Sequence, residues 1–308
     1  MKKIFVDGGA GTTGLRIAER LSERKDLMIL TIEEKYRKDA DARKDKMNEA
    51  DVVFLCLPDA AAEEAVELIG PQTAVIDTST AHRTTEGWIY GLPELHGQRE
   101  KIVQSNQIAN PGCHASGFIT LAAPLVENGI ICADAVLSCF SLTGYSGGGK
   151  KMIAEYENQD RPDLYSAPRL YGLTQKHKHL NEMKKLCGLQ SPPLFTPIVA
   201  DFYAGMLVCI QLSAEQSNGG IKDIQEVYKT YYKDGVIRFT EDADENGFLS
   251  AAAMSGRDDM QIAVFGNEER IMLVSRFDNL GKGASGAAIQ NMNLLLGVDE
   301  TFGLKIGG

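Results

Sequence analysis

The segment NPGCHASG, residues 110–117, places a cysteine directly before an apolar stretch, Phe118 to Val126. Proline and glycine are turn residues, whereas the sequence from Ala115 onward favours a helix. Cys113 is therefore expected at or just before a helix N-terminus, where the helix dipole and unpaired N–H groups favour the reactive thiolate. We predict that Cys113 is a nucleophile that takes up an acyl group, the alternative being a capped turn with an incidental thiol.

Acyl transfer through a cysteine also needs a general acid or base, and His177 and His179 lie close together in the sequence. The range 174–188 is predicted to be helical, and residues two apart on a regular helix point about 200° apart, so both rings cannot face one site. Glu182 follows His179 by three residues and can orient its ring. We predict His179 as the acid or base and His177 as the alternative, with His114 pointing elsewhere.

A glycine-rich turn follows the first predicted strand and precedes a predicted helix. Gly9-x-Gly11-x-x-Gly14 has the spacing and the context of a dinucleotide-binding turn. The glycines let the backbone approach a pyrophosphate, the helix start offers free N–H groups, and Thr12 and Thr13 add hydroxyl donors. The turn therefore predicts a nucleotide site that exchanges hydride with the acyl group on the cysteine.

The charged residues after the second predicted strand bear on the choice between NAD and NADP. Glu33 and Glu34 lie where an acid would hold the ribose 2′-hydroxyl of NAD. Lys35, Arg37 and Lys38 follow at once and can bind a 2′-phosphate instead. These residues alone leave both cofactors open, as well as a solvated charged loop.

Two further segments combine bases with small polar residues, as an anionic substrate requires. Ser79, Thr80 and Arg83 follow a predicted strand, in a loop that also holds His82. The segment GYSGGGKK, residues 144–151, is dense in N–H donors and ends in two lysines. Arginine suits bidentate contacts with phosphate or carboxylate, and lysine supplies a point charge. A solvated surface is the alternative for these bases.

The elements that must position these residues change in character along the chain. The first hundred residues alternate strands and helices, with strands predicted at 4–6, 27–32, 51–57, 73–76 and 101–104. Repeated units of this kind predict an α/β fold, a Rossmann-type doubly wound parallel sheet. After about residue 115, strands predominate, at 136–142, 194–199, 206–212, 236–239, 261–265 and 271–277. They predict an α+β domain with a mixed or antiparallel sheet, and a last helix follows at 287–296.

Composition excludes several classes of protein. The 308 residues include 42 acids and 32 bases, a formal net charge of −10, which disfavours a nucleic-acid partner. No stretch reaches the ~18 consecutive apolar residues of a membrane helix. The apolar run near the start is shorter than the apolar core of a secretory signal, so none is expected. No Cys/His cluster has zinc-finger spacing, so no metal is expected. A cytoplasmic location with free thiols follows, and the five cysteines other than Cys113 are expected to fill the core.

Together these segments resemble the N-acetyl-gamma-glutamyl-phosphate reductases, in their shorter form, within the semialdehyde dehydrogenase group. The resemblance spans nearly the whole chain in the family's order: GGAGTTG, STAHR, NPGCHASG, GYSGGGKK, KHKHLNE and DNLGKGASGAAIQN. The cysteine motif and the His-x-His-x-x-Glu segment are its specific parts. The longer form of the family usually has tyrosine after the cysteine, where this chain has His114.

The resemblance implies reduction of N-acetyl-γ-glutamyl phosphate to N-acetylglutamate 5-semialdehyde, with NADP(H) as cofactor and release of phosphate, in arginine biosynthesis. Cys113 matches the catalytic cysteine and His179 the acid or base. The expected cofactor contacts are Gly9, Gly11, Thr12, Thr13, Gly14, Lys35, Arg37, Lys38, Asn279, Gly281 and Gly283. The expected substrate contacts are Ser79, Arg83, Asn110, Ser146, Gly147, Lys150 and Glu182.

We expect an NADP-binding domain of residues 1–114 and 279–308, and a catalytic and dimerisation domain of residues 115–278. The expected partners are a small acyl phosphate and further copies of the chain, as a homodimer or homotetramer, with no nucleic acid or membrane. A related acyl-phosphate reductase, acting on an aspartate or aminoadipate derivative, is the nearest alternative. A non-catalytic NADP-binding regulator is the alternative from another class, and Cys113 argues against it.

Overall fold

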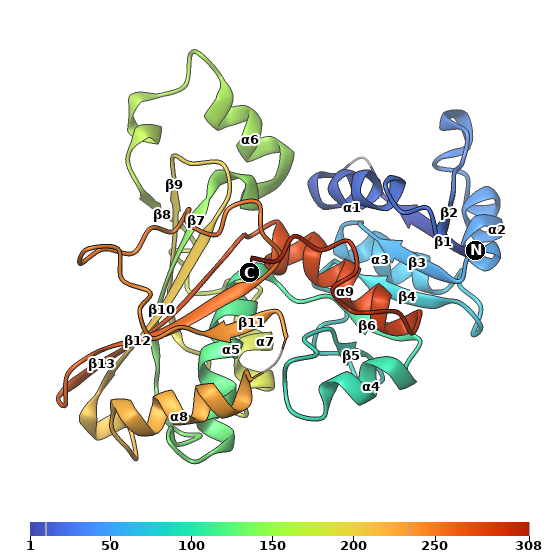
Figure 1. The fold of residues 1–308 in the computed structure, drawn as a ribbon. Coiled ribbons are helices and arrows are strands. Elements are labelled where there is room, and N and C mark those ends of the chain that lie inside the picture. The colour runs from blue at the N-terminus through green and yellow to red at the C-terminus, as the bar shows by residue number, and fades with distance from the viewer. Residues whose placement is uncertain (10, 234, 308) are drawn as a thin grey trace. The chain divides into compact units, whose positions relative to one another are not determined.

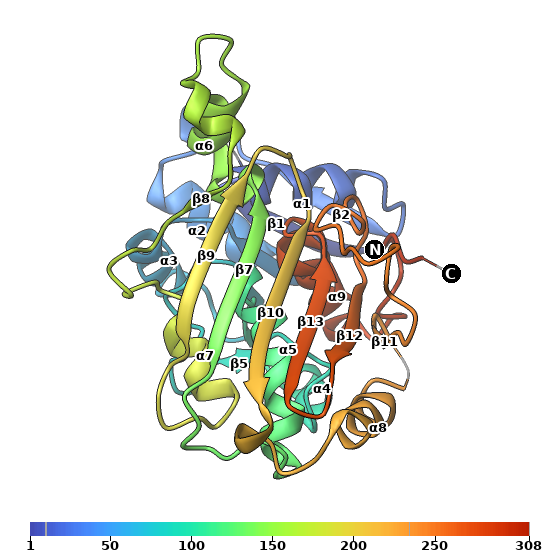
Figure 2. The same ribbon diagram turned by 90° about the vertical axis from the view of Figure 1, so that its left-hand side faces the viewer.

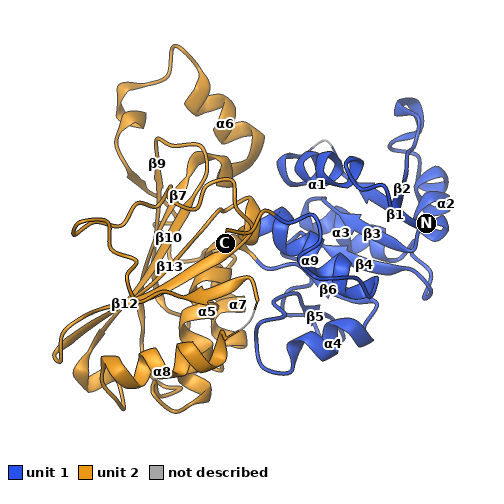
Figure 3. Cartoon of the chain, viewed as in Figure 1, with its two compact units in different colours: residues 1–111, 284–304 blue, residues 112–283, 305–308 orange. Residues whose placement is uncertain are grey.

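The structure is a computed structural model that describes residues 1–9, 11–233 and 235–307. The chain forms two compact units, shown in different colours in Figure 3. Unit 1 comprises Met1–Pro111 and Ala284–Leu304, and unit 2 comprises Gly112–Gly283 and Lys305–Gly308. Among the described residues, no helix combines the length and the apolar character needed to cross a membrane.

Unit 1 is built on a six-stranded parallel sheet (Figure 1). Its strands are β1 (Lys2–Asp7), β2 (Leu27–Leu30), β3 (Val52–Leu55), β4 (Ala74–Asp77), β5 (Ile89–Tyr90) and β6 (Gln107–Ala109). They lie in the order β2-β1-β3-β4-β6-β5. The chain reverses direction across the sheet between β1 and β3, the switch point at which doubly wound folds bind ligands. The predicted Rossmann-type sheet is confirmed.

Helices cover both faces of this sheet. They are α1 (Thr12–Ser22), α2 (Ala40–Glu49), α3 (Asp59–Val66), α4 (Gln98–Gln104) and α9 (Gly286–Leu295). One apolar cluster joins Ile17 of α1, Ile102 of α4 and Met292 of α9 to the strands, and a second cluster joins Met47 of α2 and Ala65 of α3 to the other face. A helix from the C-terminal part of the chain therefore completes the core of unit 1.

The strand predicted at 101–104 is wrong, because these residues form the end of helix α4. Ile102 is fully buried, whereas its neighbour Val103 is half-exposed. Two adjacent apolar residues on a short amphipathic helix mimic the start of a buried strand. The strand of this region is β6, which begins three residues later.

Unit 2 is built on a seven-stranded mixed sheet, as the strand-rich sequence predicts. Its strands are β7 (Ser138–Gly144), β8 (Arg169–Leu170), β9 (Leu194–Ala200), β10 (Met206–Ser213), β11 (Ile237–Phe239), β12 (Met260–Gly266) and β13 (Arg270–Phe277). The order is β11-β12-β13-β10-β7-β9-β8, with parallel pairing only for β7 with β9 and β11 with β12 among the described strands.

Three helices pack on one face of this sheet: α5 (Cys113–Glu127), α7 (Leu180–Leu186) and α8 (Ile221–Tyr231). The hydroxyls of Tyr228 and Tyr232 donate hydrogen bonds to carbonyls of α5, which joins α8 to α5. Figure 2 shows the opposite face of the strands without a helix over it. A protruding segment between β7 and β8 carries α6 (Gly149–Glu157) and two 3-10 turns, η2 (Tyr145–Gly148) and η3 (Asp163–Ser166).

All six cysteines are free thiols. Cys139, Cys187 and Cys209 are buried, as predicted for core fillers, and Cys56 is partly buried. The prediction is wrong for Cys132, which is exposed because it lies in the connection that follows α5 rather than inside an element.

Candidate active site

Cys113 is the first residue of helix α5, which confirms its predicted position at a helix N-terminus. Gly112, with extended backbone angles, is the N-cap and carries no side chain that could occupy the helix end. The remainder of α5 is almost entirely buried, whereas Cys113 is partly exposed. The first N–H groups of a helix have no partner within it, so they favour negative charge at this position.

Gly283 lies against Cys113, the predicted nucleophile. A Cβ atom at this glycine would come within 3.0 Å of the Cys113 Cβ and 3.1 Å of the Asp278 carbonyl oxygen, closer than side chains normally pack. Gly283 belongs to the π-helical turn η5 (Gly281–Ser285), and a Cβ at Gly281 would collide with the Arg257 carbonyl. The late glycine-rich segment therefore needs glycine for close packing in unit 2, independently of any cofactor contact.

Glu182 is a buried carboxylate that reaches the N-terminus of helix α5. Its side chain is only 1% exposed, and Oε2 accepts a hydrogen bond of 3.1 Å from the backbone N–H of Gly112. Its other oxygen, Oε1, lies 3.9 Å from Nε2 of His179. The same carboxylate thus links the predicted acid or base to the residue before Cys113.

The prediction that His177 and His179 diverge on one helix is wrong. Helix α7 begins only at Leu180, with His179 as its N-cap, and Gln175 has a left-handed φ of 54°. The side-chain amide of Gln175 donates a hydrogen bond to the Phe195 carbonyl and accepts one from the Phe195 N–H. These two bonds fix a turn where the helix was predicted. The two imidazole rings therefore lie together, with centroids 4.6 Å apart.

The two histidines differ in their hydrogen bonds. Nδ1 of His177 accepts a hydrogen bond of 3.2 Å from the backbone N–H of His179. A neutral His177 therefore carries its proton on Nε2, and it can gain a second proton only on Nδ1, by losing this bond. This constraint favours His179 over His177 as the group that exchanges a proton.

His114 also belongs to this cluster, contrary to the expectation that it points elsewhere. Its ring centroid lies 5.5 Å from that of His177 and 5.6 Å from that of His179. Burial, and to a smaller extent the neighbouring His177, lowers the pKa of His114 to about 3, so its ring is neutral at neutral pH. Its second ring nitrogen meets the hydroxyl of Tyr171, which no sequence motif indicated.

In unit 1, the glycines of the predicted dinucleotide-binding turn allow a tight backbone turn and a close approach of chain segments. Gly8 has φ +80°, and a Cβ there would collide with the Cys56 carbonyl; a Cβ at Gly14 would lie 2.8 Å from the Gly8 oxygen. At Gly9 and Gly11, a Cβ would meet only ordinary contacts of 3.7 Å or more from the protein. The absence of side chains at these two positions therefore leaves room for a ligand. Ala10, within the same turn, lies outside the described residues.

The turn also fits a pyrophosphate chemically. It leads into α1 at the end of β1, beside the switch point of the sheet, with Gly11 as the N-cap. Among the described residues, the buried Oγ1 of Thr12 has no hydrogen-bond partner, and Thr13 follows it in the first turn of α1. Buried hydroxyls are nearly always hydrogen-bonded, so this atom is suited to a ligand oxygen.

The charged segment after β2 is exposed. Lys35 pairs with Glu33 at 3.0 Å, and Arg37 pairs with Glu34 at 3.2 Å. Lys38 is exposed as well. Exposed ion pairs are weak, so these bases can exchange their present partners for a phosphate at little cost.

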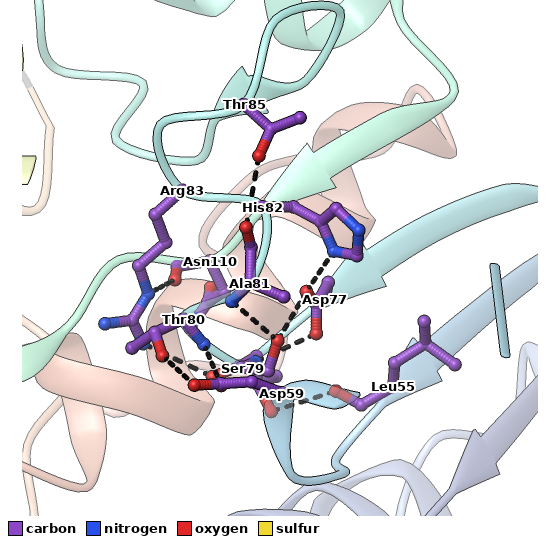
Figure 4. Close-up of polar contacts among 11 residues, drawn as sticks. Leu55, Asp59, Asp77, Ser79, Thr80, Ala81, His82, Arg83, Thr85 and Asn110 are labelled. Atoms are coloured by element: carbon purple, nitrogen blue, oxygen red, sulfur yellow. Dashed lines mark hydrogen bonds and ion pairs between the residues drawn. The ribbon is translucent and has the colours of Figure 1, made fainter. Parts of the chain in front are cut away.

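The loop after β4 is held by an internal polar network, shown in Figure 4. The carboxylate of Asp77, at the end of β4, accepts hydrogen bonds from Ser79 Oγ at 2.7 Å and from its N–H at 2.9 Å, and contacts His82 Nδ1 at 2.6 Å. Thr80 donates to Asp59. His82 is buried and stacks on Trp88 at 4.1 Å, so it stabilises the loop rather than facing a ligand.

Arg83 and Asn110 are connected in unit 1. Nε of Arg83 donates to the Asn110 carbonyl at 2.9 Å, and an Nη donates to the Thr78 carbonyl at 3.3 Å (Figure 4). The guanidinium thus holds the segment that leads in sequence to Cys113. The Asn110 amide donates to the Ala284 carbonyl at 3.1 Å, whereas its buried Oδ1 has no partner in the described part of the chain.

The remaining predicted residues lie in unit 2. Ser146 and Asn279 are buried: Asn279 donates to Ser146 Oγ at 3.0 Å and accepts from the Gly205 N–H at 2.9 Å. Gly147 and Lys150 are exposed, in η2 and α6. Asn279 therefore links Ser146, at the start of the protruding segment, to the backbone of Gly205.

Comparison with known proteins agrees with this architecture. Residues 14–105 match the family model described as semialdehyde dehydrogenase, NAD binding domain. Residues 113–279 match the model described as semialdehyde dehydrogenase, dimerisation domain. The two matched ranges fall on unit 1 and unit 2, and the second begins at Cys113.

Solved structures share the fold. Aspartate semialdehyde dehydrogenase II from Vibrio cholerae superposes with a TM-score of 0.72 at 18% identity, covering 96% of this chain and 98% of that one. The aspartate semialdehyde dehydrogenase from Candida albicans, a structure with NADP, gives 0.69 at 17% identity over 96% and 98% of the two chains.

Much closer sequence relatives exist. N-acetyl-gamma-glutamyl-phosphate reductase 2 from Nostoc sp. is 44% identical over 318 residues, covering 98% of this chain and 99% of the relative. The reductase of the same name from Brucella ovis is 44% identical over 306 residues, covering 96% and 99%. At this identity and coverage, the chain belongs to the N-acetyl-gamma-glutamyl-phosphate reductase family of semialdehyde dehydrogenases, and it is an oxidoreductase with that family's NAD-binding domain.

Proposed function

We propose that this chain reduces N-acetyl-γ-glutamyl phosphate to N-acetylglutamate 5-semialdehyde with NADPH, through a Cys113 thioester, in the cytoplasmic biosynthesis of arginine. The observation that carries the proposal is the connected set of Cys113, Glu182 and His179 in unit 2. It supplies a nucleophile at a helix start and a proton-exchanging group fixed to the same backbone. The names of the 44%-identical relatives support this choice of substrate.

The first half of the reaction builds the thioester. The Cys113 thiolate attacks the acyl carbon, a C–S bond forms, and the C–O bond to phosphate breaks with its electron pair leaving on phosphate. The N–H groups of the first turn of α5 stabilise the negative oxygen of the tetrahedral intermediate. Exposed Lys150 and the loop of Arg83 are the proposed contacts for the anionic groups of the substrate.

The second half releases the aldehyde. When bound, the reduced nicotinamide supplies a hydride to the acyl carbon. His179 holds a proton for the oxygen of the resulting thiohemiacetal and removes it again as the C–S bond breaks and the Cys113 thiolate is restored. Glu182 orients the His179 ring, and it stabilises the protonated form by its charge at 3.9 Å.

Most of the proposed cofactor contacts lie in unit 1. Gly9, Gly11 and Gly14 with the hydroxyls of Thr12 and Thr13 would hold the pyrophosphate, and Lys35, Arg37 and Lys38 the 2′-phosphate. Asn110, a proposed substrate contact in the same unit, would accept a hydrogen bond on Oδ1 from a substrate N–H group. Asn279, Gly281 and Gly283, which lie in unit 2, are the proposed contacts of the nicotinamide end. The proposed NADP-binding domain comprises residues 1–114 and 279–308, and the proposed catalytic and oligomerisation domain comprises residues 115–278.

A second copy of the chain is the proposed partner. Figure 2 shows one face of the unit 2 sheet without a helix over it. Three apolar residues of this sheet, Phe140 on β7, Leu170 on β8 and Leu194 on β9, are 38%, 57% and 60% exposed. An exposed apolar patch marks an interaction surface. The description of the matching family model as a dimerisation domain supports a homo-oligomer, and this face is the proposed site of association.

A substrate panel tests the proposed function. In the reverse direction, phosphate-dependent reduction of NADP and of NAD is measured with N-acetylglutamate semialdehyde and with aspartate semialdehyde. The proposal expects turnover with the acetylated substrate and a preference for NADP; equal turnover of aspartate semialdehyde would assign another substrate. Cys113→Ser should abolish the acyl-enzyme seen by mass spectrometry, whereas Cys132→Ser, which alters an exposed thiol, should keep it.

A further inference from the structure

Three side chains of unit 2 form a hydrogen-bond chain next to the nucleophile. Ser141 Oγ lies 2.5 Å from Nδ1 of His114, and Nε2 of His114 lies 2.5 Å from the hydroxyl of Tyr171. Ser141 is fully buried and His114 is 3% exposed. Because His114 directly follows Cys113, this chain runs from strand β7 through the nucleophile helix to Tyr171.

The direction of each hydrogen bond follows from counting donors and acceptors. A neutral imidazole has one N–H and one lone pair, and His114 is neutral at neutral pH. Within the described residues, the only hydrogen-bond partner of the buried Ser141 hydroxyl is His114 Nδ1. A buried O–H needs an acceptor, so Ser141 donates to Nδ1 and the imidazole proton is on Nε2.

The hydroxyl of Tyr171 is then the one donor in this three-residue chain whose hydrogen has no acceptor within those three residues. Nε2–H of His114 donates to the Tyr171 oxygen, so the hydrogen of the Tyr171 hydroxyl must point away from His114. In the part of the chain that the structure describes, this hydroxyl has no second hydrogen-bond partner. Burial, and after it the negative charge of Cys113, raises the pKa of Tyr171, so the hydroxyl stays protonated while Cys113 is a thiolate.

We propose that Tyr171 is a further catalytic residue, whose hydroxyl donates a hydrogen bond to the oxygen of the acyl group on Cys113 as that oxygen becomes negative. This inference rests on the proposed function, because it requires an acyl group on Cys113. Tyr171 keeps its proton throughout, so it stabilises charge without exchanging a proton with His179. Ser141 and His114 are positioning residues that keep the donor turned toward the substrate.

Tyr171→Phe tests the donor directly. Because the bond forms to a transition-state charge, kcat should fall about 100-fold while KM changes less than about threefold. Alkylation of Cys113 by iodoacetamide and the thermal unfolding midpoint should stay as in the wild type. Tyr231→Phe removes an exposed hydroxyl bonded to Glu127 in the same unit and should change neither parameter. Unchanged kcat in Tyr171→Phe, or a rise in KM alone, would overturn the proposal.

Ser141→Ala tests the positioning while leaving Tyr171 intact. Without its donor, Nδ1 of His114 can carry the proton, and the Tyr171 hydroxyl can turn to donate to Nε2. We expect kcat to fall about tenfold with little change in KM, and full activity would overturn the orientation by His114. A wild type that turned over no acyl phosphate would overturn the proposed function together with this inference, whereas an active wild type with an unaffected Tyr171→Phe would overturn only the inference.

Discussion

The carboxylate of Glu182 accepts a hydrogen bond from the backbone N–H of Gly112, the residue immediately before Cys113, at 3.1 Å. A side chain of α7 therefore fixes the backbone from which helix α5 starts. The same carboxylate lies 3.9 Å from the His179 ring, so it holds both the start of the helix that carries the proposed nucleophile and the proposed proton-exchanging group.

Replacing Glu182 separates its charge from its hydrogen bond. Glu182→Gln keeps an oxygen for the Gly112 N–H but removes the negative charge beside His179, so kcat should fall about 10-fold or more with little loss of stability. Glu182→Ala leaves a buried N–H unsatisfied and should also lower the free energy of unfolding by about 1–3 kcal/mol. Urea unfolding and steady-state kinetics measure both effects. Equal kinetics for Glu182→Gln and wild type would show that the charge of Glu182 beside His179 does not contribute to turnover.

The two neighbouring histidines should differ in their effect on turnover. His179→Asn should reduce kcat by about 100-fold or more, because it removes the proposed proton-exchanging group. His177→Asn should reduce it less, because His177 Nδ1 is already engaged by the His179 N–H. Single-turnover measurements of thioester formation and aldehyde release locate the step, and the opposite order of the two variants would exchange the assigned roles.

Two glycines of the proposed cofactor turn should differ in what their replacement weakens: NADPH binding for Gly11 and folding stability for Gly14. In Gly11→Ala the new Cβ lies 3.7 Å from the Gly8 oxygen, an ordinary contact, so the variant should fold normally and bind NADPH about 10-fold more weakly. In Gly14→Ala the Cβ lies 2.8 Å from that oxygen, so the free energy of unfolding should fall by about 1–3 kcal/mol. Fluorescence titration with NADPH and urea unfolding distinguish the two, and normal NADPH binding by Gly11→Ala would argue against a pyrophosphate there.

His114 makes stability depend on pH. Its pKa is 6.5 when unfolded and about 3 when folded, so the unfolded chain binds the proton first as pH falls. Its contribution is complete above pH 6.5, and lost progressively as pH falls toward 3; between pH 7.5 and 5 the loss is about 2 kcal/mol. His114→Gln should lack this part of the decline.

Urea unfolding at both pH values measures the effect as a slope, which cancels the constant cost of the substitution. His96→Gln, at an exposed histidine, serves as the control and should retain the wild-type decline. A His114→Gln variant with the full wild-type decline would show that the ring is not buried in its neutral form.

Much of the fold was predictable because its signals are local. The continuous apolar runs of β3 and β10 predict buried strands, and the glycine turn before α1 and the turn before α5 predict helix starts; both helix starts are confirmed. The failures at 101–104 and 174–179 have local origins too. One buried residue on a short helix imitates a strand, and a left-handed Gln175 anchored to a distant strand interrupts a helical composition.

The residues of the candidate site could be named from the sequence, but their arrangement could not. Cys113, His179 and Glu182 stand in motifs with recognisable spacing, and their roles stay predictions. Tyr171 and the orientation of His114 depend on strand β7 and on the turn before α7, elements far apart in the chain. Spacing rules describe neighbours on one element, and they carry no information about such contacts.

The split of unit 1 between the two ends of the chain has a consequence for synthesis. Ala288, Ile289 and Met292 of α9 are part of the core that contains Ile4 and Ile17. The N-terminal strands emerge from the ribosome first, yet their core cannot close until residues 284–304 have been made, whereas most of unit 2 is complete by Gly283. Unit 2, which carries Cys113, is therefore the first that can fold during translation, and unit 1 is the last.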